Sequence, residues 1–352
     1  MVQGGGGVFL SNKSDDIFKN EPKVVCAMLR KIIRAFEVLL IERRLPYAWA
    51  AAIQSSLYEK PLKECLGKVV DTRPIPCQQD AEAELHLVTC RKDTTMAIMA
   101  IKSLLRFVPN LAVVIHGDES LDEESIAIIR RSIPNCRVVT YDESSKVVID
   151  SLDIVSLRAK VADLFCLDSS YDRHKRAWAL KIFDFHLFSN SQRIIVLDSD
   201  TLFLKRPDEI IDWMNMVDAP AFYAIPDEPN LKIKESLYRE VFPRANVIRS
   251  FNGGLLGFNK SSISLDMLVD MAQTLLEHPE VSIYGDECVW RFVYSLVDSK
   301  PLPFEFYPLF ESKKRYQQMS SVQSQFKYMH FLLKHKEGLY HEIAQEVLSE
   351  LD

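Results

Sequence analysis

The chain has 352 residues, of which 47% are hydrophobic and 26% charged, so it holds enough apolar material for a large folded core. Its net charge of −6 offers no polycationic surface, which argues against nucleic acid as the main partner. The 7 cysteines include no CxxC pair, so neither a disulfide framework nor a zinc knuckle is expected.

The N-terminal part differs in pattern from the rest. Residues 1–20 include four consecutive glycines, and we expect them to be disordered. Residues 21–80 predict a helical extension and a linker, with an amphipathic helix at Val24–Leu40 and a second helix at Ala48–Tyr58. Packing on the main domain is the first interpretation of these helices. Self-association into a homo-oligomer and docking on a membrane surface are the second and third.

The same region lacks the features of a membrane or export signal. Charged residues interrupt the apolar stretch Val24–Ile41. The glycine-rich residues 1–10 lack the basic region with which a signal peptide opens. The sequence therefore predicts no transmembrane segment and no secretory signal, and we expect a cytoplasmic protein.

From residue 81 to residue 340, short apolar runs alternate with helical patterns, which is typical of βαβ units and a mostly parallel, Rossmann-like sheet flanked by helices. The predicted strands are Leu85–Cys90, Leu111–His116, Arg137–Tyr141, Arg193–Leu197, Ala219–Ile225, Gly254–Phe258 and Phe304–Tyr307. The predicted helices are Thr94–Phe107, Glu123–Ser132, Val147–Phe165, Ala177–Ser189, Leu265–Leu276 and Asp286–Tyr294, with residues 172–176 as a charged connector and a helix or tail at 341–352.

The most informative stretch follows the strand Arg193–Leu197 and reads Asp198-Ser199-Asp200. Two carboxylates at the end of a buried run need a counter-charge, and a divalent cation is the simplest one. In open α/β sheets, ligands bind at the carboxyl ends of the strands, where this pair lies. The alternative is a plain turn, because Asp and Ser are also common turn residues.

Four further clusters bear on this interpretation. Asn252 and Gly253 precede a buried strand, where an amide can bind hydroxyl groups and glycine permits close approach, although Asn-Gly also forms simple turns. Asp286 and Glu287 open a helix, where carboxylates serve as caps, although Asp286 could equally accept a hydrogen bond from a substrate hydroxyl. His330 and Lys336 offer a nitrogen ligand and a phosphate-binding cation, or only a basic loop. Arg176 and Lys181 precede the acidic strand and could counter a phosphate.

Taken in this order, the motifs resemble those of nucleotide-sugar glycosyltransferases of the GT-A fold, closest to the family-8 group of glycogenin, galactinol synthase and lipopolysaccharide galactosyltransferases. The resemblance spans about residues 83–337. It implies that Asp198, Asp200 and His330 hold Mn²⁺ or Mg²⁺, that Lys336 contacts the diphosphate, and that Thr89 and Cys90 lie beside the nucleoside. Leu333 replaces the family glycine between His330 and Lys336, and Glu287 stands where the group usually has Gln.

The resemblance implies transfer of a sugar from a nucleoside diphosphate donor, most simply a UDP-sugar, to an unidentified hydroxyl acceptor with retention of configuration. Asn252 and Asp286 would then orient the donor sugar or the acceptor. Three alternatives stay open. They are an inverting enzyme with Asp286 or Glu287 as base, a nucleotidyltransferase, which the glycine-free segment 89–95 disfavours, and a non-catalytic scaffold of the same fold.

Overall fold

The computed structural model describes residues 59–147, 153–165, 172–281, 285–309, 325–331 and 336–351. The predictions for residues 1–20 and for the helices Val24–Leu40 and Ala48–Tyr58 lie outside these residues, and the predicted division into domains stays a prediction. The described part opens with helical residues 59–67 and the 3₁₀ turn η1 (Lys68–Val70).

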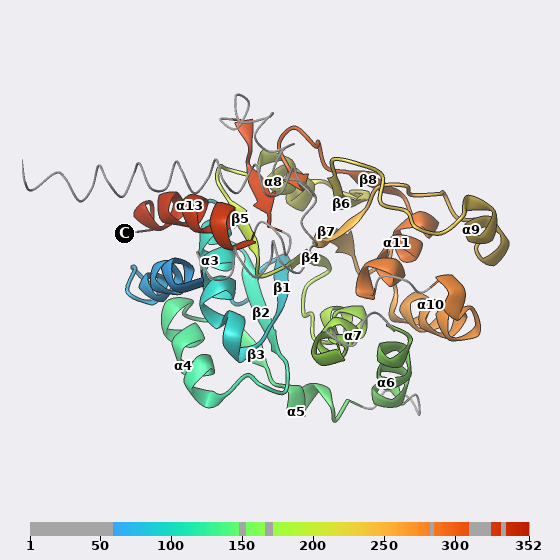
Figure 1. Cartoon of the computed structure of the whole chain (residues 1–352), viewed down its shortest axis with the longest axis horizontal. Helices are drawn as coiled ribbons and strands as arrows, with labels where there is room; N and C mark the ends of the chain where they lie inside the picture. The colour runs from blue at the N-terminus through green and yellow to red at the C-terminus, as the bar shows by residue number, and fades with distance from the viewer. Residues whose placement is uncertain are drawn as a thin grey trace, which may run out of the picture. The chain divides into compact units, whose positions relative to one another are not determined.

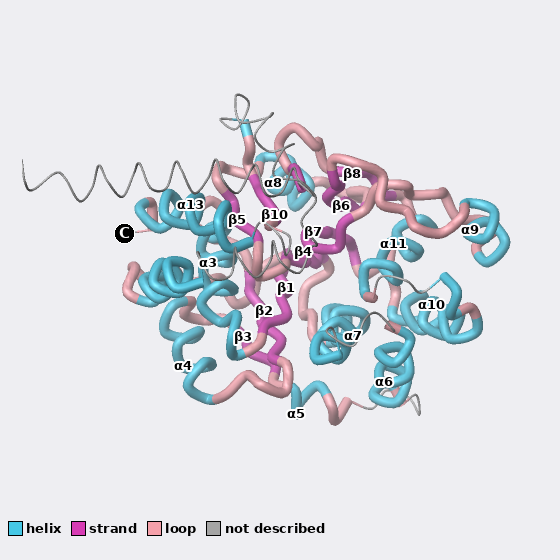
Figure 2. The backbone as a smooth tube through the Cα atoms, in the orientation of Figure 1, coloured by secondary structure: helices cyan, strands magenta, loops and turns pink. Residues whose placement is uncertain are grey.

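Within the described residues, ten strands form one sheet in the order β3-β2-β1-β4-β7-β6-β9-β10-β5, with β8 beside β6 (Figure 2). The strands are β1 (Ala83–Thr89), β2 (Ala112–Gly117), β3 (Arg137–Val139), β4 (Arg193–Leu197), β5 (Thr201–Phe203), β6 (Ala221–Pro226), β7 (Asn252–Asn259), β8 (Ser299–Pro301), β9 (Pro308–Leu309) and β10 (Tyr328–His330).

The first half of the sheet is parallel, because β1 pairs in parallel with both β2 and β4, and β2 with β3. β7 reverses the direction and lies antiparallel to β4 and β6. β9 runs parallel to β6 and β10, and β5 closes the order antiparallel to β10. The short loop between β4 and β5 is therefore tied to the late strand β10.

Helices cover both faces of this sheet (Figure 1). They are α3 (Thr94–Leu105), α4 (Glu123–Ser132), α5 (Tyr141–Ser144), α6 (Ile154–Leu164), α7 (Asp172–Leu187), α8 (Asp208–Asn215), α9 (Glu235–Val241), α10 (Leu265–Glu277), α11 (Asp286–Leu296) and α13 (Lys336–Ser349), with 3₁₀ turns η2 (Arg91–Asp93) and η4 (Pro279–Val281). In Figure 1, α3, α4 and α13 lie on one side of the strands and α6, α7, α10 and α11 on the other. None of the described helices is both long and apolar enough to cross a membrane.

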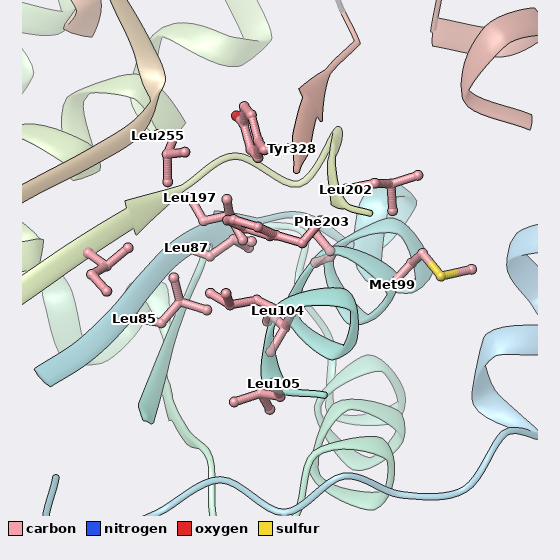
Figure 3. Packing of buried hydrophobic residues seen from close by; sticks show 14 of the residues in the cluster. Leu85, Leu87, Met99, Leu104, Leu105, Leu197, Leu202, Phe203, Leu255 and Tyr328 are labelled. Atoms are coloured by element: carbon pink, nitrogen blue, oxygen red, sulfur yellow. The ribbon is translucent and has the colours of Figure 1, made fainter. Parts of the chain in front are cut away.

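Strand β4 shows why the sheet needs two helical layers. Successive side chains of a strand point to opposite faces. Ile195 and Leu197 belong to the core beneath α3, part of which Figure 3 shows, whereas Ile194 and Val196 belong to the core beneath α7. All four side chains are at most 1% exposed. A continuous apolar run is thus what a strand covered on both faces requires.

The predicted α/β class with a mostly parallel sheet is confirmed, and six of the seven predicted strands coincide with observed ones to within a few residues. The predicted strand Phe304–Tyr307 is wrong, since these residues form a turn before the two-residue strand β9. The third strand ends at Val139, because Thr140 caps α5 through a capping box with Glu143.

Two helix boundaries also differ from the prediction. The charged residues 172–176 are not a connector but the first turns of α7, since Arg and Lys are good helix formers. The helix predicted to start at Val147 starts at Ile154, where the Asp153 carboxylate accepts a hydrogen bond from Ser156 N; residues 148–152 lie outside the described part.

Candidate metal and donor site

The acidic pair lies at the carboxyl end of β4, and backbone hydrogen bonds fix the turn that carries it. Asp198 N donates to Gly254 O on β7 at 2.9 Å. Thr201 Oγ1 donates to the carbonyl oxygen of Asp198 at 2.7 Å. The two side chains keep 21% and 19% of their surface exposed, so the turn leaves the carboxylates of Asp198 and Asp200 accessible.

His330 reaches this turn through the pairing of β10 with β5. In that ladder, His330 is opposite Thr201, and Phe331 N donates to Asp200 O at 3.0 Å. The imidazole Nε2 consequently lies 3.1 Å from Asp200 Oδ1 and 3.8 Å from Asp198 Oδ2. Burial lowers the pKa of His330, but the charges of Asp200 and Asp198 outweigh it and raise that pKa above its usual value.

The three side chains fit one divalent cation. Their donor atoms all lie within 4.8 Å of one another, a spread that ligands of one ion with bonds of roughly 2.0–2.4 Å can bridge. Two carboxylates and one imidazole suit Mn²⁺, and also Mg²⁺ if water completes the shell. Among the described residues, no other group of three or more His, Cys, Asp or Glu side chains meets this geometric condition.

Lys181, on α7, joins the acidic turn to helix α11. Its Nζ lies 2.5 Å from Asp198 Oδ1 and 3.4 Å from Asp286 Oδ2, with 11% of the side chain exposed. Burial disfavours the ammonium, but the two carboxylates outweigh this and raise the pKa of Lys181. Burial also raises the pKa of Asp286, which the charge of Lys181 offsets only in part. The lysine is therefore held charged at the centre of the site.

Helix α11 begins beside this lysine because of a glycine. Gly285 adopts φ 60°, a conformation that L residues rarely accept, and the Trp178 ring lies 3.1 Å from where its Cβ would be. The next two residues are the acidic pair Asp286 and Glu287, which the glycine turn presents at the helix start. A helix N-terminus stabilises such carboxylates.

Glu287 is held by two residues that the sequence analysis did not single out. Arg291 donates to Glu287 Oε1 at 3.0 Å and Asn230 donates to the same oxygen at 3.2 Å. Burial outweighs the nearby guanidinium and raises the pKa of Glu287 to about 7. Arg291 follows Glu287 by four residues on one helix, a spacing that could have revealed it, whereas Asn230 gives no local signal.

The remaining predicted site residues are spread along the same edge of the sheet. Thr89 is buried at the end of β1, and Cys90 follows it half-buried, with burial and Asp93 raising the pKa of its thiol to about 11. Arg176 is exposed and forms an ion pair with Glu119. Its predicted contact with a phosphate stays a prediction.

The structure brings together the predicted residues Asp198, Asp200, His330, Asn252, Lys181 and Asp286. Ser199 lies between the two aspartates and is half-buried, and Gly253 is buried beside the first turn of α11. Lys336 is the first residue of α13, and its side chain lies outside the described part. The roles assigned to these residues stay predictions.

Comparison with solved structures identifies the architecture. The galactosyltransferase LgtC, in complex with donor and acceptor sugar analogs, matches over 76% of this chain and 95% of its own, with 13% identity and a TM-score of 0.51. A second LgtC structure, that of an active site mutant, gives 14% identity, the same coverage and a TM-score of 0.52. This chain has the GT-A fold.

Other comparisons add less. Mouse xyloside xylosyltransferase 1 matches over 71% of this chain and 97% of its own with 17% identity, but at a TM-score of 0.45. No protein-family model and no curated protein sequence matches the chain. The predicted fold class is thus confirmed by structure, at identities too low to carry an activity across.

Proposed function

We propose that the chain is a metal-dependent glycosyltransferase that moves a sugar from a nucleoside diphosphate donor to an acceptor hydroxyl. The observation that carries this proposal is the convergence of Asp198, Asp200 and His330 at the carboxyl edge of a GT-A sheet, with Lys181 beside them. The finer form, a family-8-like enzyme that uses a UDP-sugar and retains configuration, rests on the motif resemblance.

The residues of the site have distinct tasks in this proposal. Asp198, Asp200 and His330 hold Mn²⁺ or Mg²⁺, which supplies positive charge to the leaving diphosphate. Lys181, fixed 2.5 Å from Asp198, adds a preorganised cation at the same place. Asp286 is 8% exposed and held by Lys181, so its carboxylate is oriented to accept a hydrogen bond from a sugar hydroxyl.

An inverting reaction is the nearest alternative. Asp286 faces the Lys181 ammonium at 3.4 Å and Glu287 faces Arg291 at 3.0 Å, so both candidate bases are paired with cations. Burial nevertheless raises the pKa of both carboxylates, that of Glu287 to about 7, so these ion pairs do not remove either one as a base. The preference for retention therefore rests on the motif resemblance, and NMR of the product anomer tests it: an inverted product would reject the retaining mechanism.

The proposal is tested by donor hydrolysis with and without Mn²⁺, using UDP-, GDP- and ADP-sugars. We expect release of one nucleoside diphosphate by the wild-type protein and none by Asp198→Ala/Asp200→Ala. Asp270→Asn, which removes one charge from an exposed position on α10, is the matched control and should retain turnover.

Three other outcomes would replace the proposal. Metal-dependent binding of UDP without turnover favours the scaffold. Formation of a sugar nucleotide from a nucleoside triphosphate and a sugar phosphate favours a nucleotidyltransferase. Absence of both metal binding and turnover removes the site assignment altogether. The cytoplasmic location and a homo-oligomer formed through the N-terminal helices stay predictions.

A further inference from the structure

Asn252, the first residue of β7, is engaged inside the protein. Only 4% of its surface is exposed. Its side-chain oxygen Oδ1 accepts a hydrogen bond from Gly254 N at 3.0 Å and lies 2.9 Å from Nδ1 of His330. The oxygen that could have bound a sugar hydroxyl is therefore already shared between a backbone amide and the imidazole of His330.

These two contacts determine the tautomer of His330. A backbone N–H can only donate, so the atom of Asn252 that faces Gly254 N must be the carbonyl oxygen rather than the amide nitrogen. The same oxygen can only accept, so Nδ1 of His330 carries a hydrogen. In a neutral, metal-binding imidazole the single N–H would then be on Nδ1 and the lone pair on Nε2, the nitrogen that lies 3.1 Å from Asp200 Oδ1.

Gly254 makes the close approach of the ring possible. A Cβ at this position would lie 2.4 Å from Cε1 and 2.5 Å from Nδ1 of His330. The ring thus packs directly on the glycine backbone, whose carbonyl oxygen also accepts the hydrogen bond from Asp198 N. Strand β7 consequently contacts the backbone N–H of Asp198 through the Gly254 carbonyl, and it contacts the imidazole through the Asn252 side chain that the Gly254 amide holds.

We propose that Asn252 is a positioning residue that holds His330 in the Nδ1–H tautomer and directs its Nε2 toward a divalent cation on Asp198 and Asp200. The inference deepens the proposed function and rests on it for the identity of the metal site. Hydrogen-bond partners on the far nitrogen of a metal-binding histidine commonly fix the ring and its tautomer in this way, and their loss weakens metal binding by about 10- to 100-fold.

The test measures Mn²⁺ affinity by electron paramagnetic resonance, so that it does not depend on turnover. We expect Asn252→Ala to bind Mn²⁺ about 10- to 100-fold more weakly than wild type. Asn252→Asp should bind within a few-fold of wild type, because its carboxylate accepts the same two hydrogen bonds. Asn259→Ala, at the other end of β7, is the matched control and should leave the affinity unchanged.

A second measurement keeps the proposal testable if Asn252→Ala fails to fold. Nitrogen-15 NMR of the wild-type protein with Mg²⁺ reports directly which nitrogen of His330 carries the hydrogen, and we expect Nδ1. An Nε2–H signal would overturn the proposal. So would wild-type Mn²⁺ affinity in Asn252→Ala together with a raised KM for the donor, which is the result expected of a sugar-binding amide.

The two proposals fail in distinguishable ways. If wild type binds Mn²⁺ with the expected dependence on Asn252 but turns over no sugar nucleotide, the positioning role stands and the glycosyltransferase proposal falls. If turnover is found and depends on metal, but Mn²⁺ affinity does not depend on Asn252, the positioning role falls alone. If wild type binds no Mn²⁺, the positioning role is rejected together with the metal-dependent mechanism.

Discussion

Two clusters in this protein have similar residue composition but differ in solvent exposure. The edge site consists of Asp198, Asp200 and His330 with Lys181 and Asp286. The polar chain consists of Glu84, His86, His116, Asp184 and Arg158, which lie between the sheet and helices α6 and α7. Both clusters combine carboxylates, histidine and a cation, and α7 contributes to both through Lys181 and Asp184.

The polar chain is closed to solvent. Glu84 Oε2 lies 3.4 Å from His86 Nε2, the two histidines meet at 2.9 Å, and His116 Nδ1 lies 3.9 Å from Asp184 Oδ2. Asp184 ends the chain in a 2.6 Å ion pair with Arg158. The carboxylates and imidazoles of the chain are at most 3% exposed.

What separates the two clusters is the solvent exposure of their carboxylates. Glu84 accepts hydrogen bonds from Ser189 Oγ, Asn190 N and Ser191 N. Asp198 accepts a hydrogen bond from Lys181 and Asp200 contacts His330, but both aspartates keep about a fifth of their surface exposed. A carboxylate enclosed by the protein maintains structure, whereas carboxylates that converge on one solvent-accessible space are arranged for an ion. Residue type alone does not make this distinction.

The largest expected effect is loss of stability from the polar chain. Arg158→Met leaves the buried carboxylate of Asp184 without its cation, which should cost about 3–5 kcal/mol in the free energy of unfolding. Urea denaturation measures this, with Arg249→Met, which breaks an exposed pair with Glu235, as a control expected to lose less than about 1 kcal/mol. Equal losses in both variants would contradict the comparison. Mn²⁺ affinity should be unaffected by either change.

A change in the edge site should reduce turnover rather than stability. Asp200→Asn removes a proposed metal ligand and should reduce donor turnover by about 10²–10³-fold. The free energy of unfolding measured in EDTA should change by less than about 1 kcal/mol, because the carboxylate is partly exposed. A turnover defect accompanied by a large loss of stability would mean that Asp200 maintains the fold.

Glu84 gives the polar chain a distinct pH dependence. Burial alone would raise the pKa of Glu84, but His86 and Ser189 outweigh it and lower that pKa to about 2. Because the folded pKa is depressed, its contribution of about 3 kcal/mol is present above pH 4.5 and is lost as the pH falls toward 2. Acid unfolding of wild type and Glu84→Gln should therefore converge at low pH. A constant difference between them would contradict the assignment.

The smallest expected effect concerns Lys181. Its side chain should weaken Mn²⁺ binding but increase donor turnover. Its ammonium competes with a metal ion for Asp198, so Lys181→Met should tighten Mn²⁺ binding by about 1–2 kcal/mol, roughly tenfold. Turnover should nevertheless fall, because a cation near the leaving diphosphate is removed. Titration calorimetry with Mn²⁺ and donor hydrolysis measure the two effects, and weaker Mn²⁺ binding would show that Lys181 supports the site instead.

Much of the fold could be predicted from the sequence because its signals are local. The apolar run Arg193–Leu197 and the helix Glu123–Ser132 have the bounds predicted for them, since burial on two faces and helical periodicity leave direct traces in neighbouring residues. The strand predicted at Phe304–Tyr307 is wrong because a short aromatic run there serves a turn.

The site could be predicted only in part from such local signals. The sequence by itself placed Asp198 and Asp200 after a buried strand, and the motif resemblance pointed to His330. Only the tertiary structure decided that β10 pairs with β5, which brings His330 within 3.1 Å of a residue 130 positions earlier, and that Asn252 faces the imidazole. Strand pairing across such a sequence distance depends on the closure of the whole sheet, which no neighbouring stretch of residues encodes. The donors that surround each carboxylate likewise come from distant parts of the chain.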